Sequence, residues 1–152
     1  MPLRSALLTV LACSALAGCG GDDEGDGQPR DFRAAADEIC VRHNERLDEI
    51  RQRSTGRQIS VEEAVENLRA EATIKEEQLE DLRGLKPPPA VNGYLDRLER
   101  NAAGYREAAD EVEATRGRSF EDFLNRMFNS ENAARREAEA LGLRHCSPAP
   151  LN

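Results

Sequence analysis

The 152-residue chain lacks the short motifs that mark common catalytic sites. It contains no Gly-x-Ser-x-Gly nucleophile turn, no His-Glu-x-x-His zinc motif and no glycine-rich phosphate loop. Its many acidic residues lie on segments that are predicted to be exposed to solvent. In such surroundings nothing would shift their pKa values toward those of a general acid or base. The sequence therefore predicts a protein that is not an enzyme.

An excess of positive charge is also missing. The chain has 21 basic residues against 29 acidic ones, and its net charge is −8 at pH 7. Nucleic acids and anionic lipid surfaces attract proteins through basic patches. The composition therefore argues against a nucleic-acid partner and against electrostatic binding to a membrane.

No apolar run reaches the roughly 20 residues that a membrane-spanning helix needs. The longest apolar stretch extends from about Ser5 to Ala17, follows the basic residue Arg4 and ends in small residues. This arrangement is typical of a secretory signal peptide. We therefore expect residues 1–18 to be a signal peptide.

The tetrapeptide Leu16-Ala17-Gly18-Cys19 stands where such a peptide would be cleaved, and it resembles the lipobox of bacterial lipoproteins. The resemblance implies that the Cys19 thiol receives diacylglycerol, that cleavage precedes Cys19, and that the new amino terminus is acylated, for instance with palmitate. The protein would then be anchored by lipid on the extracytoplasmic face of the cell membrane, or in the periplasm if the host has an outer membrane. Residues 19–30 contain glycine and acidic residues but no apolar residue after Cys19, which predicts a flexible linker.

Alternation with a period of two is absent, so the sequence predicts no strands. Apolar residues instead recur at spacings of three and four in four segments, about 31–53, 61–83, 90–116 and 120–141. Ser60 and Ser119 are the expected N-caps, and Gly84, Gly117 and Gly142 the expected ends. Because the connections are short, we expect an all-α fold, an antiparallel up-down four-helix bundle over residues 31–146, followed by a disordered tail at 147–152.

The spacing also assigns an inner face to each helix. The expected inner residues are Phe32, Ala36, Ile39, His43, Leu47 and Ile50 in the first segment; Val61, Val65, Leu68, Ala72, Lys75, Leu79 and Leu82 in the second; Val91, Leu95, Leu98, Ala102, Tyr105, Ala109 and Val112 in the third; and Phe120, Phe123, Leu124, Met127, Ala134, Ala138 and Leu141 in the fourth.

Cys40 and Cys146 are the cysteines that remain once Cys19 carries lipid and the signal peptide is removed. Exported thiols tend to oxidise. In an up-down bundle the first helix begins at the end where the fourth finishes, and the segment after Gly142 can extend back about 13 Å to reach the height of Cys40. The sequence therefore predicts a Cys40–Cys146 disulfide.

A zinc site is the alternative for the same residues. Cys40, His43, His145 and Cys146 together form a Cys2His2 set. The neighbours His145 and Cys146 are awkward joint ligands, and the compartment favours oxidation. We therefore favour the disulfide and expect no metal or other cofactor.

Three polar residues interrupt the apolar inner faces: His43, Lys75 and Glu131. Counted from the shared end of the bundle they fall at similar heights, so they could form one polar layer that binds a small acidic or zwitterionic ligand. They could also form a buried layer that fixes helix register. We favour a third interpretation, in which Lys75 and Glu131 reach solvent and His43 makes a single hydrogen bond.

The pattern as a whole resembles small helical lipoproteins of actinobacteria. The shared features are the acidic linker, Cys40 early in the first helix, the turn Leu85-Lys86-Pro87-Pro88, and the ending Leu141-Gly142-Leu143-Arg144-His145-Cys146. The resemblance implies the anchor, the fold and the disulfide, and it carries no activity. We therefore expect a non-enzymatic binding or scaffolding module with a protein partner at the cell envelope; the alternative is a small-ligand receptor that uses the polar layer.

Overall fold

The computed structural model describes residues 30–146. The predicted signal peptide, Cys19, nearly all of the linker and the predicted tail lie outside the described residues. The predictions for them are taken up again only as proposals.

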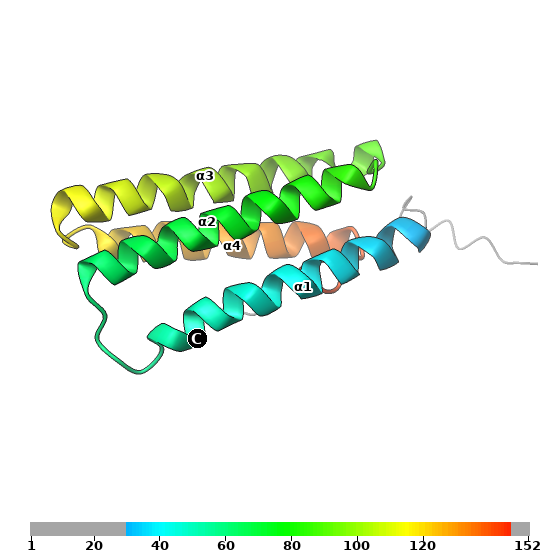
Figure 1. Ribbon diagram of the computed structural model, residues 1–152. Helices are drawn as coiled ribbons and strands as arrows, with labels where there is room; N and C mark the ends of the chain where they lie inside the picture. The colour runs from blue at the N-terminus through cyan, green and yellow to red at the C-terminus, as the bar shows by residue number, and fades with distance from the viewer. Residues whose placement is uncertain (1–29, 147–152) are drawn as a thin grey trace, which may run out of the picture.

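Four long helices make up the described part of the chain: α1 (Arg30–Ser54), α2 (Val61–Gly84), α3 (Asn92–Thr115) and α4 (Phe120–Ala140). A short 3-10 helix, η1 (Pro89–Val91), leads into α3. The all-α four-helix class is confirmed, and residues 30–146 contain no strand. Figure 1 shows that consecutive helices run in opposite directions, with α1 inclined to the other three. Among the described helices none has the length and apolarity of a membrane span.

Two of the predicted helix ends form as expected. The Ser60 hydroxyl accepts a hydrogen bond from the backbone N–H of Glu63 at 3.1 Å, which caps α2. Gly142 has a positive φ of 73°, and the N–H of Leu143 bonds to the carbonyl of Ala138 at 2.9 Å. This is a Schellman ending, in which glycine takes the left-handed position.

Two other predicted ends are wrong in detail. Ser119 precedes α4, but its hydroxyl lies 2.9 Å from that of Thr115 and does not cap the helix. Gly84 is the last residue of α2 and is not left-handed; the positive φ of that turn, 54°, falls on Lys86.

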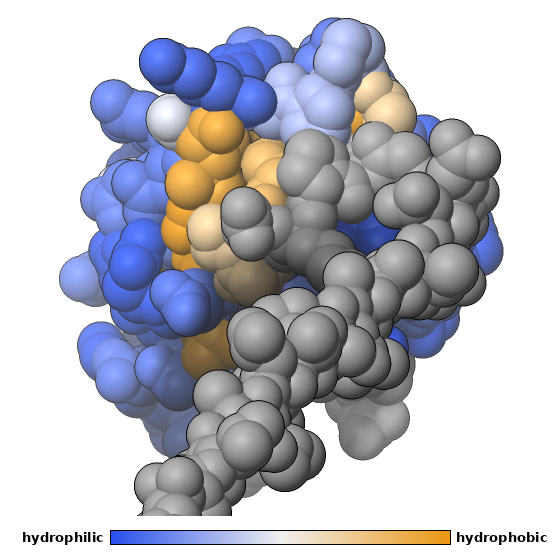
Figure 2. Space-filling view, turned by 90° about the vertical axis from the view of Figure 1, so that its right-hand side faces the viewer, coloured by the Kyte–Doolittle hydropathy of each residue, from blue (hydrophilic) through white to orange (hydrophobic). Residues whose placement is uncertain are grey.

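The end of the bundle where α1 begins has a core made by all four helices. We call it the disulfide end. Fully buried residues here include Ala36 and Cys40 of α1, Leu82 of α2, Tyr94 of α3 and Ala138 of α4, and Leu143 packs among them. Figure 2 views this end and shows apolar residues gathered between hydrophilic surfaces. Half-buried Leu85 and Leu141 pack against the same core.

The opposite end is built differently, and we call it the open end. Its core comes from α2, α3 and α4, with Leu68, Tyr105 and Phe123 as examples, and includes no residue of α1. The second half of α1 instead packs Leu47 and Ile50 against Ile74 of α2. The Cα atoms of α1 and α4 stay more than 8 Å apart, and α1 diverges from the other helices toward its C-terminal end (Figure 1).

The divergence of α1 explains the main error in the predicted core. Leu124 was expected on the inner face of α4, yet it is 45% exposed, and Phe128 one turn later is 43% exposed. Both lie on the flank of α4 that carries Glu131, which contacts Arg51 of α1. Since α1 does not close against this flank, the two apolar side chains remain in contact with solvent.

Candidate functional site

A buried polar cluster lies where the two ends of the bundle meet. The Lys75 ammonium of α2 is 3.0 Å from the Glu131 carboxylate of α4, and both side chains are nearly inaccessible. The Tyr105 hydroxyl of α3 donates a hydrogen bond to the same carboxylate at 2.6 Å. The Lys75 nitrogen also lies 5.2 Å from the centre of the Tyr105 ring, a cation–π distance.

Arg51 of α1 joins this cluster from the other side. Its Nη2 atom donates to Glu71 at 3.1 Å and to Glu131 at 3.3 Å. Two cations and two anions therefore meet across α1, α2 and α4. A buried charge is tolerated when it is paired and hydrogen-bonded, and each member of this cluster has at least one such partner.

The cluster holds Glu131 and Arg51 in their charged states. Burial alone would raise the pKa of Glu131, but Lys75 and Arg51 outweigh it and lower that pKa to about 2. Burial would lower the pKa of Arg51, but the carboxylates of Glu71 and Glu131 raise it above the ordinary value. Burial, followed by the charge of Glu131, raises the pKa of Tyr105 well above 10. Tyr105 therefore stays protonated and acts as a donor.

A cleft of about 240 Å³ opens beside this cluster at the open end. Its walls are mostly apolar and come from all four helices, with Ile50, Leu68, Tyr105 and Met127 as examples. Arg51 and Glu71 line it as its charged residues, whereas Lys75 and Glu131 do not. Apolar walls with a few placed polar groups are the usual composition of a ligand site.

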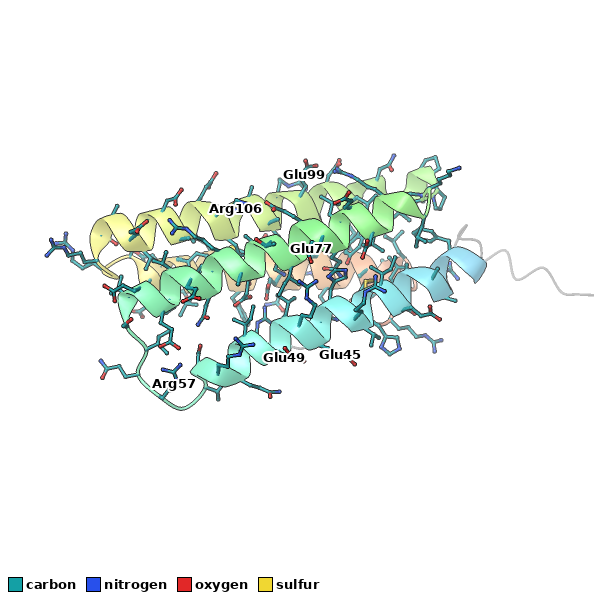
Figure 3. All side chains as sticks on the ribbon, viewed as in Figure 1. Glu45, Glu49, Arg57, Glu77, Glu99 and Arg106 are labelled. Carbon is teal, nitrogen blue, oxygen red and sulfur yellow. A yellow bond between two sulfur atoms is a disulfide. The ribbon has the colours of Figure 1, made fainter. Side chains whose placement is uncertain are left out.

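The mouth of the cleft combines polar and apolar groups. Asn67 of α2 donates a hydrogen bond to the Ser54 hydroxyl of α1 at 2.8 Å, and both side chains line the cleft. Leu124 of α4 also lines the cleft and is half-exposed, and Phe128, which is similarly exposed, follows it one helical turn along α4. Other surfaces of the bundle are dominated by charged side chains such as Glu49, Glu99 and Arg106 (Figure 3).

The structure brings together two of the three residues of the predicted polar layer. Lys75 and Glu131 pair directly, so the expectation that both reach solvent is wrong; they are 3% and 5% exposed. His43 is also buried, but its Nε2 atom lies 2.9 Å from Asp81 of α2, and it makes no hydrogen bond or ion pair with Lys75 or Glu131. The proximity of His43 and Arg42 lowers the pKa of Asp81.

Arg51 and Glu71 were missed from the sequence. They stand one helical turn from expected inner residues: Arg51 follows Leu47 by four, and Glu71 precedes Lys75 by four. That spacing places them at the edge of the buried face. An arginine or glutamate at an edge position is usually predicted to be exposed to solvent. Arg51 and Glu71 line a cleft only because α1 diverges from the other helices.

The predicted disulfide is present in the structure. Cys40 and Cys146 are bonded, with Cα atoms 4.8 Å apart. Their thiols are consumed, so they do not act as zinc ligands in this state. Within residues 30–146, no three His, Cys, Asp or Glu side chains are grouped so that they could hold a metal ion.

No protein-family model matches the chain, and neither a curated protein nor a solved structure gives a significant match. The resemblance to helical actinobacterial lipoproteins therefore stays a prediction. The functional argument rests on the geometry of this molecule.

Proposed function

We propose that the chain is a lipid-anchored helical bundle at the extracytoplasmic face of the cell membrane, where it acts as a non-enzymatic binding module. The observation that carries the proposal is the cleft at the open end, whose apolar walls surround the charged pair Arg51 and Glu71. The lipobox Leu16-Ala17-Gly18-Cys19 supports the anchor. The acidic linker supports a bundle held a short distance from the lipid.

The cleft favours a small ligand over a catalytic role. Arg51 and Glu71, the charged residues of its lining, are already paired with each other. The raised pKa of Arg51 and the lowered pKa of the neighbouring Glu131 keep these two groups in their ordinary charged states. A general acid or base needs a pKa near the working pH. The residues at the floor are therefore arranged for recognition.

Scaffolding of a protein partner is the second candidate function, and it rests on Leu124 and Phe128. These two residues, one turn apart on α4, are both close to half exposed. Exposed apolar side chains that cluster beside a cleft are typical of contact surfaces. A partner seated on them would also cover the mouth of the cleft.

The anchor is tested by the variant Cys19→Ala and membrane fractionation. We expect an uncleaved precursor or a soluble protein, in contrast to the processed, membrane-bound wild type. Normal processing and firm membrane attachment of the variant would refute the anchor.

The binding function is tested by incubating the purified full chain with a small-molecule extract of cultured cells of the organism that produces the protein. After desalting, mass spectrometry should find a molecule retained by the wild type. Ala64→Trp, which fills the cleft from α2, should abolish retention, while Ala103→Trp on an exposed position of α3 should not. Circular dichroism verifies that both variants fold. Retention that survives Ala64→Trp, or no retention by the wild type, would contradict a binding role for the cleft.

A further inference from the structure

Arg51 and Glu71 line the cleft, and their pair leaves polar atoms without a partner among residues 30–146. Both hydrogen bonds of the Arg51 guanidinium come from Nη2, and Nη1 and Nε donate no hydrogen bond to any other residue of 30–146. On the partner, Oε2 accepts the bond from Arg51, and Oε1 accepts none from the described residues. None of these three atoms is a buried polar atom without a partner, so solvent or a ligand reaches them. Two neighbouring residues of the cleft lining therefore keep a donor edge on Arg51 and an acceptor atom on Glu71 available for a ligand.

Charge balance decides which ligand chemistry fits. Arg51, Lys75, Glu71 and Glu131 sum to zero, and their mutual contacts lie between 3.0 and 3.3 Å. A ligand that carries a lone carboxylate or a lone ammonium would leave this poorly hydrated cluster with an unbalanced charge, which is costly away from water. A ligand that carries both charges leaves the sum at zero. It can bind the guanidinium edge and the free carboxylate oxygen together.

We propose that the cleft binds a free α-amino acid with an apolar side chain. Its carboxylate binds Nη1 and Nε of Arg51, its ammonium donates to Oε1 of Glu71, and its side chain lies against apolar walls such as Leu68, Phe123 and Met127. The spacing suits this ligand, because both charged groups of an α-amino acid are bonded to the same carbon atom and Nη2 of Arg51 lies only 3.1 Å from Glu71. The inference rests on the proposed binding function and names its ligand class.

The test compares three forms of one ligand by isothermal titration calorimetry with the full chain purified in detergent. L-phenylalanine carries both charges, N-acetyl-L-phenylalanine only the carboxylate, and L-phenylalanine methyl ester only the ammonium. L-leucine and L-norleucine vary the apolar part. We expect the zwitterion to bind at least tenfold more tightly than either singly charged form, since each of those loses one charge-assisted hydrogen bond.

Two variants then assign the partners. Glu71→Gln should remove most of the preference for phenylalanine over its N-acetyl form. Arg51→Gln should remove most of the preference for phenylalanine over its methyl ester. Arg106→Gln, which breaks the exposed pair with Glu76 on the outer surface, is the matched control and should leave all affinities unchanged. If either cleft variant fails to fold, the ligand series on the wild type decides alone.

The outcomes separate this inference from the proposed function. Equal binding of all three phenylalanine forms would overturn the zwitterion assignment and leave the cleft as an apolar binding site. No binding of any form, together with retention of another molecule from the culture extract, would overturn the ligand class alone. No binding and no retention would overturn both.

Discussion

The two ends of this bundle hold α1 by different means. At the disulfide end, α1 contributes Phe32, Ala36, Ile39 and Cys40 to a four-helix core and is covalently bonded to the segment after α4. At the open end, α1 packs through Leu47 and Ile50 on α2 alone, and its link to α4 is the ion pair of Arg51 with Glu131.

Under the proposed binding function, this difference assigns stability to one end of the bundle and ligand recognition to the other. Apolar burial and a disulfide stabilise the fold without placing charged groups in the interior that would need partners. The ion pairs of Arg51 stabilise the fold little more than apolar contacts of the same size would, because the desolvation of the charges offsets their attraction, but they keep polar atoms available beside an apolar cleft. Because the disulfide end is firmly held, the open end can keep a cleft while the four-helix bundle stays folded.

The largest expected effect comes from breaking the covalent link. The Cys40→Ala/Cys146→Ala double variant frees a loop with a sequence separation of 106 residues. We expect a loss of about 4–5 kcal/mol in the free energy of unfolding, and a melting temperature lower by roughly 15 °C. Thermal unfolding followed by circular dichroism measures this change.

Reductant provides the control for the disulfide. It should lower the melting temperature of the wild type and leave the double variant unchanged. Mass spectrometry of unreduced exported protein should show that Cys40 and Cys146 are oxidised. Two free thiols would contradict the disulfide at this end of the bundle.

Acid should weaken the junction between the two ends. Glu131 has its pKa lowered from 4.5 to about 2 in the fold. A lowered pKa stabilises the fold above pH 4.5, and this stabilisation, about 3 kcal/mol, is lost as the pH falls toward 2. Urea unfolding between pH 6 and 2 should therefore show a steeper loss for the wild type than for Glu131→Gln. Parallel slopes would show that the carboxylate is not paired with Lys75 and Arg51 in solution.

Hydrogen exchange tests whether the second half of α1 opens by itself. Amides of residues 47–54 should exchange at least tenfold faster than those of 36–43, a difference of about 1.4 kcal/mol in opening free energy. Residues 108–115 of α3 are the control, since they are equally close to a helix end but belong partly to the core of the open end. Equal protection of 47–54 and 36–43 would show that α1 is held uniformly.

Much of this arrangement could be predicted from the spacing of apolar residues. The expected inner positions of α1 and α3 are all buried, because a period of 3.6 assigns one face of a helix wherever that face meets a partner. The Cys40–Cys146 pairing also follows from topology. Lys75 and Glu131 were identified by the same logic, as polar residues on otherwise apolar faces.

The cleft could not be predicted, because it depends on the angle between α1 and α4. Spacing determines which face of α4 carries Leu124, but not whether a neighbour covers it. The partner of His43 was missed for a related reason: Asp81 reads as an exposed residue of α2, and only the rotation of α2 against α1 brings it within 2.9 Å. Helix packing angles depend on side chains of both helices together.

The smallest effect should come from the exposed flank of the open end. Leu124 is 45% exposed, so Leu124→Ala should change the free energy of unfolding by no more than about 0.5 kcal/mol. The same substitution at the disulfide end, Leu143→Ala, removes a side chain with no exposed surface and should cost about 3 kcal/mol. Urea unfolding of the two variants measures this contrast directly. A loss above 2 kcal/mol for Leu124→Ala would mean that α1 closes over this flank in solution, and the difference between the two ends would disappear.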